Sequence, residues 1–150
     1  GRRALDAILG WAIAQEIGAE RTGFRVSPGT TMWGIAEGAE GPDLYRHLVG
    51  ELDKLGLAYV HVMHQGDEPL LADIRRLWSR TLIVNRPGRP REAIGSDIAA
   101  GLADMEAYGQ MILANPDFLA RLKADAPLNE GDRMSFFGGT AKGYTDYPTL

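Results

Sequence analysis

Strand-like and helix-like segments alternate four times along this chain of 150 residues, and this alternation limits the possible fold more than any other feature. Short β-prone runs are predicted at 23–27, 57–62, 81–85 and 103–108, and helices at 4–18, 42–55, 67–78, 90–101 and 115–123. Strands that alternate with helices form a parallel sheet with helices packed on it. The pattern therefore predicts an α/β fold, and periodicity alone leaves a barrel and a doubly wound sheet as alternatives.

Residues that commonly begin or end helices support these boundaries. Pro42 suits the first turn of one helix, and Gly56 suits its C-terminal end. Asp67 can cap the next helix, and Asn115-Pro116-Asp117 supplies a cap, a proline and an acid for the last one. The tail from Pro127 onward has no periodicity and is predicted to be an ordered covering segment.

The composition argues against several classes of partner. The net charge is −4 and no cluster of Lys and Arg occurs, so neither nucleic acid nor an anionic membrane is expected as a partner. The chain contains no cysteine, which excludes disulfides and thiol chemistry. The best apolar run, 8–17, is interrupted by Gly10, Gln15 and Glu16, so no membrane span is expected. No signal peptide is recognisable, and a cytoplasmic location is expected.

Four motifs resemble one enzyme family. They are Arg21-Thr-Gly-Phe-Arg-Val-Ser-Pro28, Ala107-Tyr-Gly-Gln-Met-Ile-Leu-Ala-Asn-Pro-Asp117, Ala126-Pro-Leu-Asn129 and Gly143-Tyr-Thr-Asp-Tyr-Pro148. Together they resemble the C-terminal half of the Old Yellow Enzymes, which are flavin-dependent oxidoreductases with a (β/α)8 TIM-barrel fold. The resemblance implies that residues 1–150 form the C-terminal half of a flavin-binding TIM-barrel domain and supply about the last four βα units.

The length of the chain agrees with half a barrel. A complete barrel takes about 250 residues, so four strands would be half of one. A dinucleotide-binding sheet is disfavoured because no strand runs into G-x-G-x-x-G. The resemblance further implies FMN as cofactor, NAD(P)H as hydride donor, and a small-molecule substrate with an activated C=C bond, such as an enone. The catalytic residues are unknown in this chain, because the family carries them on the half that would lie upstream of residue 1.

Arg25 is the first candidate for the cofactor site. An arginine within a short strand needs a partner for its charge, either a carboxylate on a neighbouring strand or a bound anion. In the resembling family, the arginine of the "G-x-R-x-S-P" motif lies against the pyrimidine edge of the flavin. The resemblance therefore implies that Arg25 stabilises negative charge on the reduced ring.

The loops after the last two strands are the candidates for a phosphate site. In barrels, working residues lie at the C-terminal ends of the strands, and the loops after strands seven and eight commonly bind phosphate. Glycines in such loops let backbone N–H groups approach the phosphate, and a helix N-terminus adds favourable partial charge. The cofactor-binding residues predicted here are Asn85, Gly88, Arg89, Gly109 and Gln110.

The sequence departs from the family at these loops. Family members generally carry "N-G-G-Y" where this chain has Asn85-Arg-Pro-Gly-Arg89, and "F-G-R" where it has Tyr108-Gly109-Gln110. Gln110 cannot supply the charge of the missing arginine. One hypothesis is that Arg86 or Arg89 supplies that charge from the adjacent loop.

Two aromatic residues are candidates for contact with the substrate. Phe137 stands where the family usually has the tyrosine of "T-F-Y-G-G", so it keeps the aromatic surface but lacks the hydroxyl donor. Trp33 lies in the loop after the Arg25 strand and is expected at the mouth of the pocket. His61 and His64 flank the end of a strand and are interpreted as structural histidines, and no metal site is expected.

Two alternatives to a flavin ene-reductase remain from the sequence. The first is a non-catalytic half-barrel that serves as a binding or assembly module, which the changes at Gln110 and Phe137 would fit. The second is a related reductase that uses a deazaflavin. Half a barrel leaves two sheet edges unpaired, so the chain is expected to pair with the missing N-terminal half-barrel or with a second copy.

Overall fold

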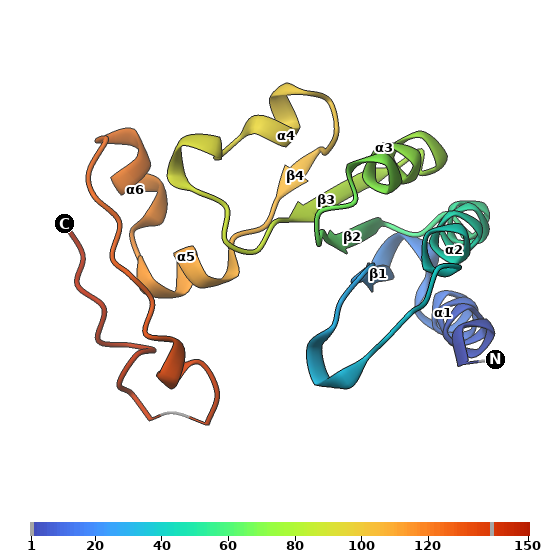
Figure 1. Ribbon diagram of the computed structural model, residues 1–150, viewed down its shortest axis with the longest axis horizontal. Coiled ribbons are helices and arrows are strands. Elements are labelled where there is room, and N and C mark those ends of the chain that lie inside the picture. The colour runs from blue at the N-terminus through green and yellow to red at the C-terminus, as the bar shows by residue number, and fades with distance from the viewer. Residues whose placement is uncertain (1, 139) are drawn as a thin grey trace. The chain divides into compact units, whose positions relative to one another are not determined.

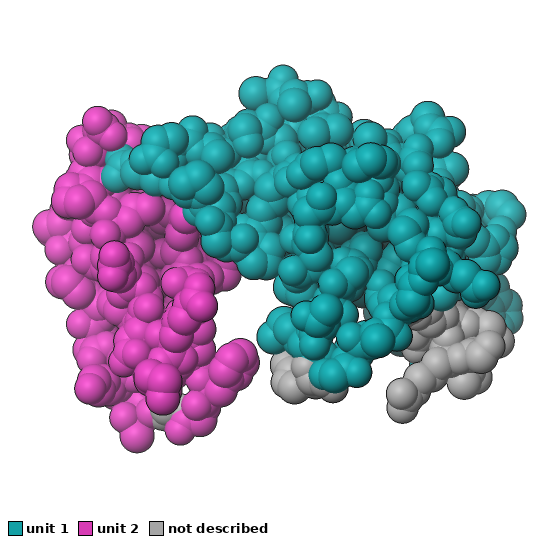
Figure 2. All heavy atoms as spheres, viewed as in Figure 1, with its two compact units in different colours: residues 1–107 teal, residues 108–150 magenta. Residues whose placement is uncertain are grey.

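The computed structural model describes the backbone of residues 2–138 and 140–150, and their side chains except those of residues 2–8 and 33. The chain divides into two compact units, Gly1–Ala107 and Tyr108–Leu150, which Figure 2 colours separately. The first unit contains the parallel sheet and the helices packed on it. The second contains two short helices and the C-terminal tail.

The first unit is built on four parallel strands, β1 (Gly23–Val26), β2 (Tyr59–Met63), β3 (Thr81–Asn85) and β4 (Met105–Glu106). The order in the sheet is β1-β2-β3-β4, so each strand lies beside the one that precedes it in the chain. A doubly wound sheet reverses its strand order at a switch point. This sheet has no reversal, which is the arrangement found in a segment of a barrel.

Helices α1 (Arg2–Ile17), α2 (Gly41–Leu55) and α3 (Glu68–Leu77) lie along the same side of this sheet (Figure 1). Alternate strand residues point toward them, and the apolar stripes of α2 and α3 cover these residues. The core formed in this way contains Val26, Leu48, Val49, Leu52, Val60, Val62, Leu70, Leu71, Ile74, Trp78, Leu82 and Val84. Burial of these branched side chains is the main force that holds the helices against the sheet.

Several predicted boundaries are confirmed. Strand β3 has the predicted bounds, and α2 ends at Gly56, whose φ of 70° is the left-handed conformation expected of a C-terminal glycine. Asp67 caps α3, because its Oδ1 accepts a hydrogen bond from the backbone N–H of Leu70 at 2.9 Å.

The prediction of one continuous helix at 90–101 is wrong. The segment contains a single 3-10 turn, η3 (Arg91–Ala93), and then the short helix α4 (Ser96–Ala99). Gly95 separates them with a φ of 84°, a left-handed conformation that a continuous helix cannot contain. The following strand is also shorter than the predicted 103–108, since only Met105 and Glu106 pair with β3.

The side of α1 that faces the sheet differs from the predicted one. Gly10 and Ala14 are buried, whereas Leu9, Ile13 and Ile17 of the predicted stripe are about half exposed. A Cβ atom on Gly10 would lie 3.3 Å from the ring of Phe24, so the helix approaches β1 through its small residues. The side chains of Leu5 and Ile8, also in the predicted stripe, lie outside the described residues.

The opposite side of the sheet, which we call the open face, carries none of the helices that the structure describes in the first unit. Parallel register places three rows of residues on this face: Gly23, Tyr59 and Thr81; Arg25, His61, Ile83 and Met105; and Met63 and Asn85. The two sides of β2 accordingly differ in their exposure. Val60 and Val62 are buried under the helices, but Tyr59 on the open face is 39% exposed.

Two further 3-10 turns lie in the connections of the first unit. The turn η1 (Ala19–Arg21) links α1 to β1, and η2 (Met32–Gly34) lies in the long segment between β1 and α2. That segment is fastened by Glu37, whose carboxylate accepts hydrogen bonds from the Gly29 N–H at 2.9 Å and the Tyr45 hydroxyl at 2.5 Å. None of the described helices combines the length and the hydrophobicity of a transmembrane segment.

The second unit contains α5 (Gly109–Ala114), α6 (Phe118–Lys123) and the turn η4 (Arg133–Ser135). Asn115 is fully buried at its centre and was predicted to cap α6. Its side chain instead donates to the carbonyls of Met111 and Asn129 and accepts from the Asn129 N–H at 2.7 Å. Helix α6 begins only at Phe118, which places Pro116 before the helix rather than in its first turn.

Parts of the tail, at Pro127, Asn129 and Pro148, are held against α5 and α6. Arg121 is buried and donates to Asp117 at 2.7 Å, to the Pro127 carbonyl at 2.7 Å and to the Pro148 carbonyl at 2.8 Å. Asn129 also donates to the Pro148 carbonyl. The two side chains thus replace the regular backbone hydrogen bonds that a non-periodic segment lacks.

Candidate cofactor site

Arg25 lies on the open face of the sheet, near the C-terminal end of β1. It is level with His61 on β2, which in turn is level with Ile83 on β3. The side chain is exposed, and its Nη2 donates to the sulfur of Met63 at 3.4 Å. Among the described residues, no carboxylate forms an ion pair with Arg25, so the structural alternative considered from the sequence is not observed. The guanidinium remains available to an anion above the open face.

His61 lies beside Arg25 on the neighbouring strand and also has few hydrogen-bond partners among the described residues. Its Nε2 atom is buried and has no hydrogen-bond partner within the described part of the chain. Burial lowers the pKa of the His61 imidazole, and the nearby charge of Arg25 lowers it further. The neutral imidazole is therefore the favoured form, and the open face carries its positive charge on Arg25.

The C-terminal ends of β2 and β3 border a cavity of about 550 Å³. Gly88 lines it with a φ of 74°, and a Cβ atom placed on Gly88 would meet no other atom within 4 Å. The space beside this turn is thus open to a ligand. The full lining consists of His64, Gln65, Gly66, Arg86, Pro87, Gly88, Arg89, Pro90, Ala93, Ser96 and Asp97.

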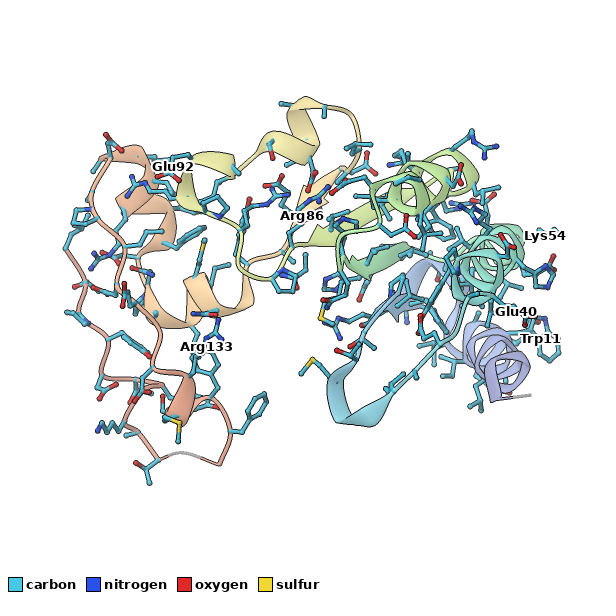
Figure 3. All side chains as sticks on the ribbon, in the orientation of Figure 1. Trp11, Glu40, Lys54, Arg86, Glu92 and Arg133 are labelled. Carbon is cyan, nitrogen blue, oxygen red and sulfur yellow. The ribbon has the colours of Figure 1, made fainter. Side chains whose placement is uncertain are left out.

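Six side chains around this cavity form an ion-pair network, which we define as His64, Glu68, Arg86, Arg89, Asp97 and Glu106. Arg86 occupies its centre, on the segment that follows β3 (Figure 3). Its Nη1 and Nη2 donate to the Glu68 carboxylate at 2.5 and 2.9 Å, and its Nε and Nη2 donate to Asp97 at 2.8 and 2.9 Å. The network therefore ties the start of α3 to the start of α4.

Charge pairing within the network shifts the pKa values of its members. The hydrogen bonds from Arg86 lower the pKa of Glu68 to about 2, with a smaller contribution from His64 and with burial opposing the shift. The hydrogen bonds of Glu68 and then Asp97 raise the pKa of Arg86. Both groups are consequently charged throughout the physiological range.

Arg89 is buried within this network. Its side chain is only 4% exposed and forms ion pairs with Asp97 and Glu106, whose side chains are equally inaccessible. Burial opposes its charge, but the hydrogen bonds to Glu106 and Asp97 outweigh burial and raise the pKa of Arg89. The remaining acceptor is the Ala93 carbonyl at 3.1 Å. This pairing gives Arg89 a structural role, and its predicted contact with phosphate stays a prediction.

Asn85 and His64 also fasten this end of the sheet. The Asn85 side chain donates to the Ala107 carbonyl at 2.7 Å, and the Asn85 carbonyl accepts from the His64 N–H at 2.8 Å. The buried imidazole of His64 contacts Glu68 at 2.9 Å, in agreement with its interpretation as a structural histidine. Asn85 thus holds the ends of β2 and β4 against β3.

The other predicted site residues lie elsewhere. Gly109 and Gln110 form the first turn of α5 in the second unit, and both are exposed. Phe137, in the same unit, is 84% exposed. The side chain of Trp33 lies outside the described residues. The predicted contacts of these four residues with cofactor or substrate stay predictions.

Sequence reasoning did not identify the three carboxylates that pair with the loop arginines. Glu68 was seen only as part of a helix start, and Asp97 and Glu106 were assigned to a helix and a strand without a role. Their partners are 8 to 18 residues away in the chain, so no local motif marks them. The presence of two arginines in one short loop, each in need of a counter-ion, was the available signal.

Comparison with known proteins supports a relationship over almost the entire chain. The "12-oxophytodienoate reductase-like protein" of Solanum lycopersicum is 35% identical over 152 residues, which cover 99% of this chain and 41% of that protein. No protein-family model matches the chain.

Solved structures agree with this result. The old yellow enzyme of Trypanosoma cruzi aligns with a TM-score of 0.87 and 30% identity over 98% of this chain and 40% of its own. Morphinone reductase in complex with tetrahydroNAD aligns with a TM-score of 0.83 and 34% identity over 93% of this chain and 38% of its own. The parallel sheet is therefore a segment of a TIM barrel, and the chain spans about two fifths of the relatives' length. The chain belongs to the Old Yellow Enzyme family, as its sequence motifs indicated.

Proposed function

We propose that the full-length protein containing this chain is an FMN-dependent oxidoreductase that reduces activated C=C bonds, such as those of enones, with hydride from NAD(P)H. The relatives named above are reductases, which supports oxidoreductase activity. The observation that carries the proposal is Arg25: it is an exposed guanidinium in the middle of a strand, on the open face, and without a carboxylate partner among the described residues.

The described residues fit a flavin in two places. The Arg25 guanidinium is a donor suited to the electron-rich edge of an isoalloxazine ring, and the apolar Ile83 shares its row on the open face. The turn at Gly88 borders an open cavity at the C-terminal end of β3, where barrels commonly bind phosphate. We therefore assign Arg25 to the ring and the Gly88 backbone to the phosphate.

When bound, FMN supplies the redox chemistry by accepting hydride from the nicotinamide and passing it to the alkene carbon. Arg25 places a fixed positive charge beside the position where negative charge develops on the ring, and this charge stabilises the reduced cofactor. The neutral state of His61 leaves that electrostatic role to Arg25. Met63 limits the positions of the guanidinium through its contact with Nη2.

Gly109, Gln110 and Arg89 are further proposed cofactor contacts, and Phe137 and Trp33 are proposed substrate contacts, on the basis of the sequence motifs. The non-catalytic alternative is less favoured because the relatives are reductases. The deazaflavin alternative has no support among them.

The proposal predicts that the full-length protein is purified as a yellow species with a flavin absorption spectrum. Adding NADH or NADPH without oxygen should bleach that absorbance, and a subsequent enone should restore it. A colourless preparation that binds no added FMN would contradict the proposal. If the protein binds FMN but transfers no hydride to enones, the proposed cofactor would stand and the proposed reaction would be wrong.

A further inference from the structure

We infer that Glu37 is a positioning residue for substrate binding, because its carboxylate anchors the segment that carries Met32 and Trp33. This segment, residues 28–40, follows β1, and we call it the rim segment. The inference rests on the proposed function and concerns how the same site holds its alkene substrate.

The rim segment begins at the edge of the sheet near which Arg25 lies. Strand β1 ends at Val26, and the chain runs from there through the rim segment to α2 (Figure 1). A Cβ atom on Gly29 would lie 3.6 Å from the Cβ atom of Gln65, so the base of the segment lies beside the end of β2. Barrel enzymes place their working residues at this edge of the sheet.

Few buried apolar side chains hold the rim segment in place. Among residues 31–40, leaving aside the side chain of Trp33, Glu37 is the one that is not exposed to solvent. Met32 is 45% exposed and Ile35 is 43% exposed. A cavity of about 400 Å³ lies between the segment and the starts of α2 and α3. A segment with so little apolar burial depends on polar contacts for its position.

Glu37 supplies polar contacts that reach beyond its own turn. One carboxylate oxygen accepts a hydrogen bond from the Gly29 N–H at 2.9 Å, and the other accepts from the Tyr45 hydroxyl at 2.5 Å. Tyr45 belongs to α2 and is buried in the core. The backbone hydrogen bonds described within the segment are local, as where the Ile35 N–H donates to the Met32 carbonyl at 3.3 Å. Hydrogen bonds to a carboxylate are stronger than those between neutral groups, so Glu37 ties the segment to the core.

Loss of this anchor is expected to affect the substrate and not the cofactor. Without it, Met32 and Trp33 would no longer be held in one position, and loops beside a site often determine how well the substrate binds. The groups assigned to FMN, Arg25 and the turn at Gly88, lie outside the rim segment. The affinity for FMN should therefore be retained.

The test follows the reaction of reduced FMN in the full-length protein with 2-cyclohexenone in the absence of oxygen, over a range of enone concentrations. In Glu37→Ala, the enone concentration that gives half the maximal rate is expected to rise roughly tenfold, while the dissociation constant of FMN changes less than about twofold. Glu37→Gln keeps one oxygen as an acceptor and Tyr45→Phe removes one donor, so each should have a smaller effect. An unchanged half-saturating concentration in Glu37→Ala would overturn the inference.

Glu40→Ala is the matched control. Glu40 belongs to the same segment and lies directly before α2 (Figure 3), where it is exposed and its side chain makes no capping hydrogen bond. This variant removes the same charge and should leave the half-saturating enone concentration unchanged. A rise equal to that in Glu37→Ala would show that the lost charge, rather than the lost anchor, is responsible, and would refute the role of Glu37.

Hydrogen exchange measures the anchor without the reaction. In the full-length protein, peptides from residues 28–40 should exchange at least severalfold faster in Glu37→Ala than in the wild type or Glu40→Ala, while peptides from β2 and β3 stay unchanged. Equal exchange in all three proteins would overturn the inference. Faster exchange with unchanged enone saturation would limit Glu37 to a structural role, which also contradicts it.

The two proposals can fail separately. A wild-type protein that binds FMN but does not react with the enone would refute the proposed reaction and, with it, the substrate role of Glu37. Faster exchange in Glu37→Ala would then be evidence for the anchor alone. A reactive wild type with an unaffected Glu37→Ala variant would refute only the role of Glu37.

Discussion

At the scale of single residues, Arg25 and Arg89 show how differently two arginines of one sheet are used. Arg89 is buried, has two carboxylate partners and helps to hold a connection together. Arg25 is exposed on the open face and contacts only the Met63 sulfur among its described hydrogen-bond partners. The Arg25 guanidinium has no carboxylate partner among the described residues. Its position is explained if it binds a ligand that is negatively charged or gains negative charge during the reaction.

Replacing Arg25 with Met should therefore affect cofactor binding far more than stability. The free energy of unfolding is expected to change by about 0.5 kcal/mol or less, as for other exposed sites. The affinity for FMN is expected to fall roughly tenfold or more, because a charged hydrogen bond is lost. Arg80→Met, at another exposed arginine, is the matched control and should leave both quantities unchanged. An unchanged affinity in Arg25→Met would contradict the assignment of Arg25 to the ring.

His61 gives a second prediction, for the pH dependence of stability. Its pKa is lower in the folded protein than its ordinary value of 6.5, first because of burial and then because of Arg25. The unfolded chain therefore binds the proton more readily, and stability falls as the pH decreases below about 6.5. We expect urea denaturation midpoints to fall less between pH 7.5 and pH 5.5 in His61→Gln than in the wild type. Equal decreases would show that His61 does not contribute.

At the scale of elements, the sequence predicted best those segments whose boundaries are set locally. Helices α2 and α3 each have an apolar stripe; Gly56 marks the C-terminal end of α2 and Asp67 marks the N-terminal end of α3. Strand β3 is a short run rich in β-branched residues. The segment 90–101 has helix-forming residues, but Gly95 interrupts it. Glycine inside a helical pattern leaves both outcomes open, and the tertiary pairing of Glu106 with the Gly95 N–H decides between them.

The candidate site was predictable to the same degree. Arg25 and the turn at Gly88 could be named from motifs, because each lies where a strand ends. The ion-pair network could not, because Asp97 and Glu106 reach Arg89 through the folding of the connection between β3 and β4. Buried charge pairs of this kind depend on three-dimensional proximity, which a single sequence does not contain.

The ion-pair network predicts a large loss of stability when Asp97 is changed to Asn. Asp97 is 4% exposed and is the carboxylate that Arg86 and Arg89 share, so its removal takes one ionised partner from each guanidinium and leaves Glu68 and Glu106 as the other partners. We expect a loss of about 2–3 kcal/mol in the free energy of unfolding, measured in urea, because charge-assisted hydrogen bonds of a buried group are weakened. Glu51→Gln, which removes a solvent-exposed pair with Lys54, should cost less than about 1 kcal/mol. Similar costs for the two variants would contradict the structural role of the network.

At the scale of the whole molecule, the open face explains why strand residues such as Tyr59 and Met105 are exposed. The interior of a TIM barrel is filled by layers of side chains from alternate strands around the barrel. This chain spans about two fifths of its relatives and contributes four strands to such an interior. Tyr59, Ile83 and Met105 accordingly lie on the open face, away from the described helices of the first unit.

A cavity of about 620 Å³ lies beside the edge strand β1 and is lined in part by Leu9, Ile13, Ile17 and Phe24. An open strand edge next to exposed apolar side chains favours association. We therefore expect residues 1–150 produced alone to self-associate and to bind a hydrophobic dye, as followed by analytical ultracentrifugation and dye fluorescence. A stable monomer with no dye binding would contradict this expectation.

We propose that one flavin lies on the open face with its ring beside Arg25 and its phosphate beside the turn at Gly88. The most direct measurement is a crystal structure of the full-length protein with FMN bound. We expect hydrogen bonds from the Arg25 guanidinium to the pyrimidine edge of the ring and a phosphate in contact with the Gly88 turn. A flavin bound elsewhere, or an Arg25 side chain that does not reach it, would show that this placement of the cofactor is wrong.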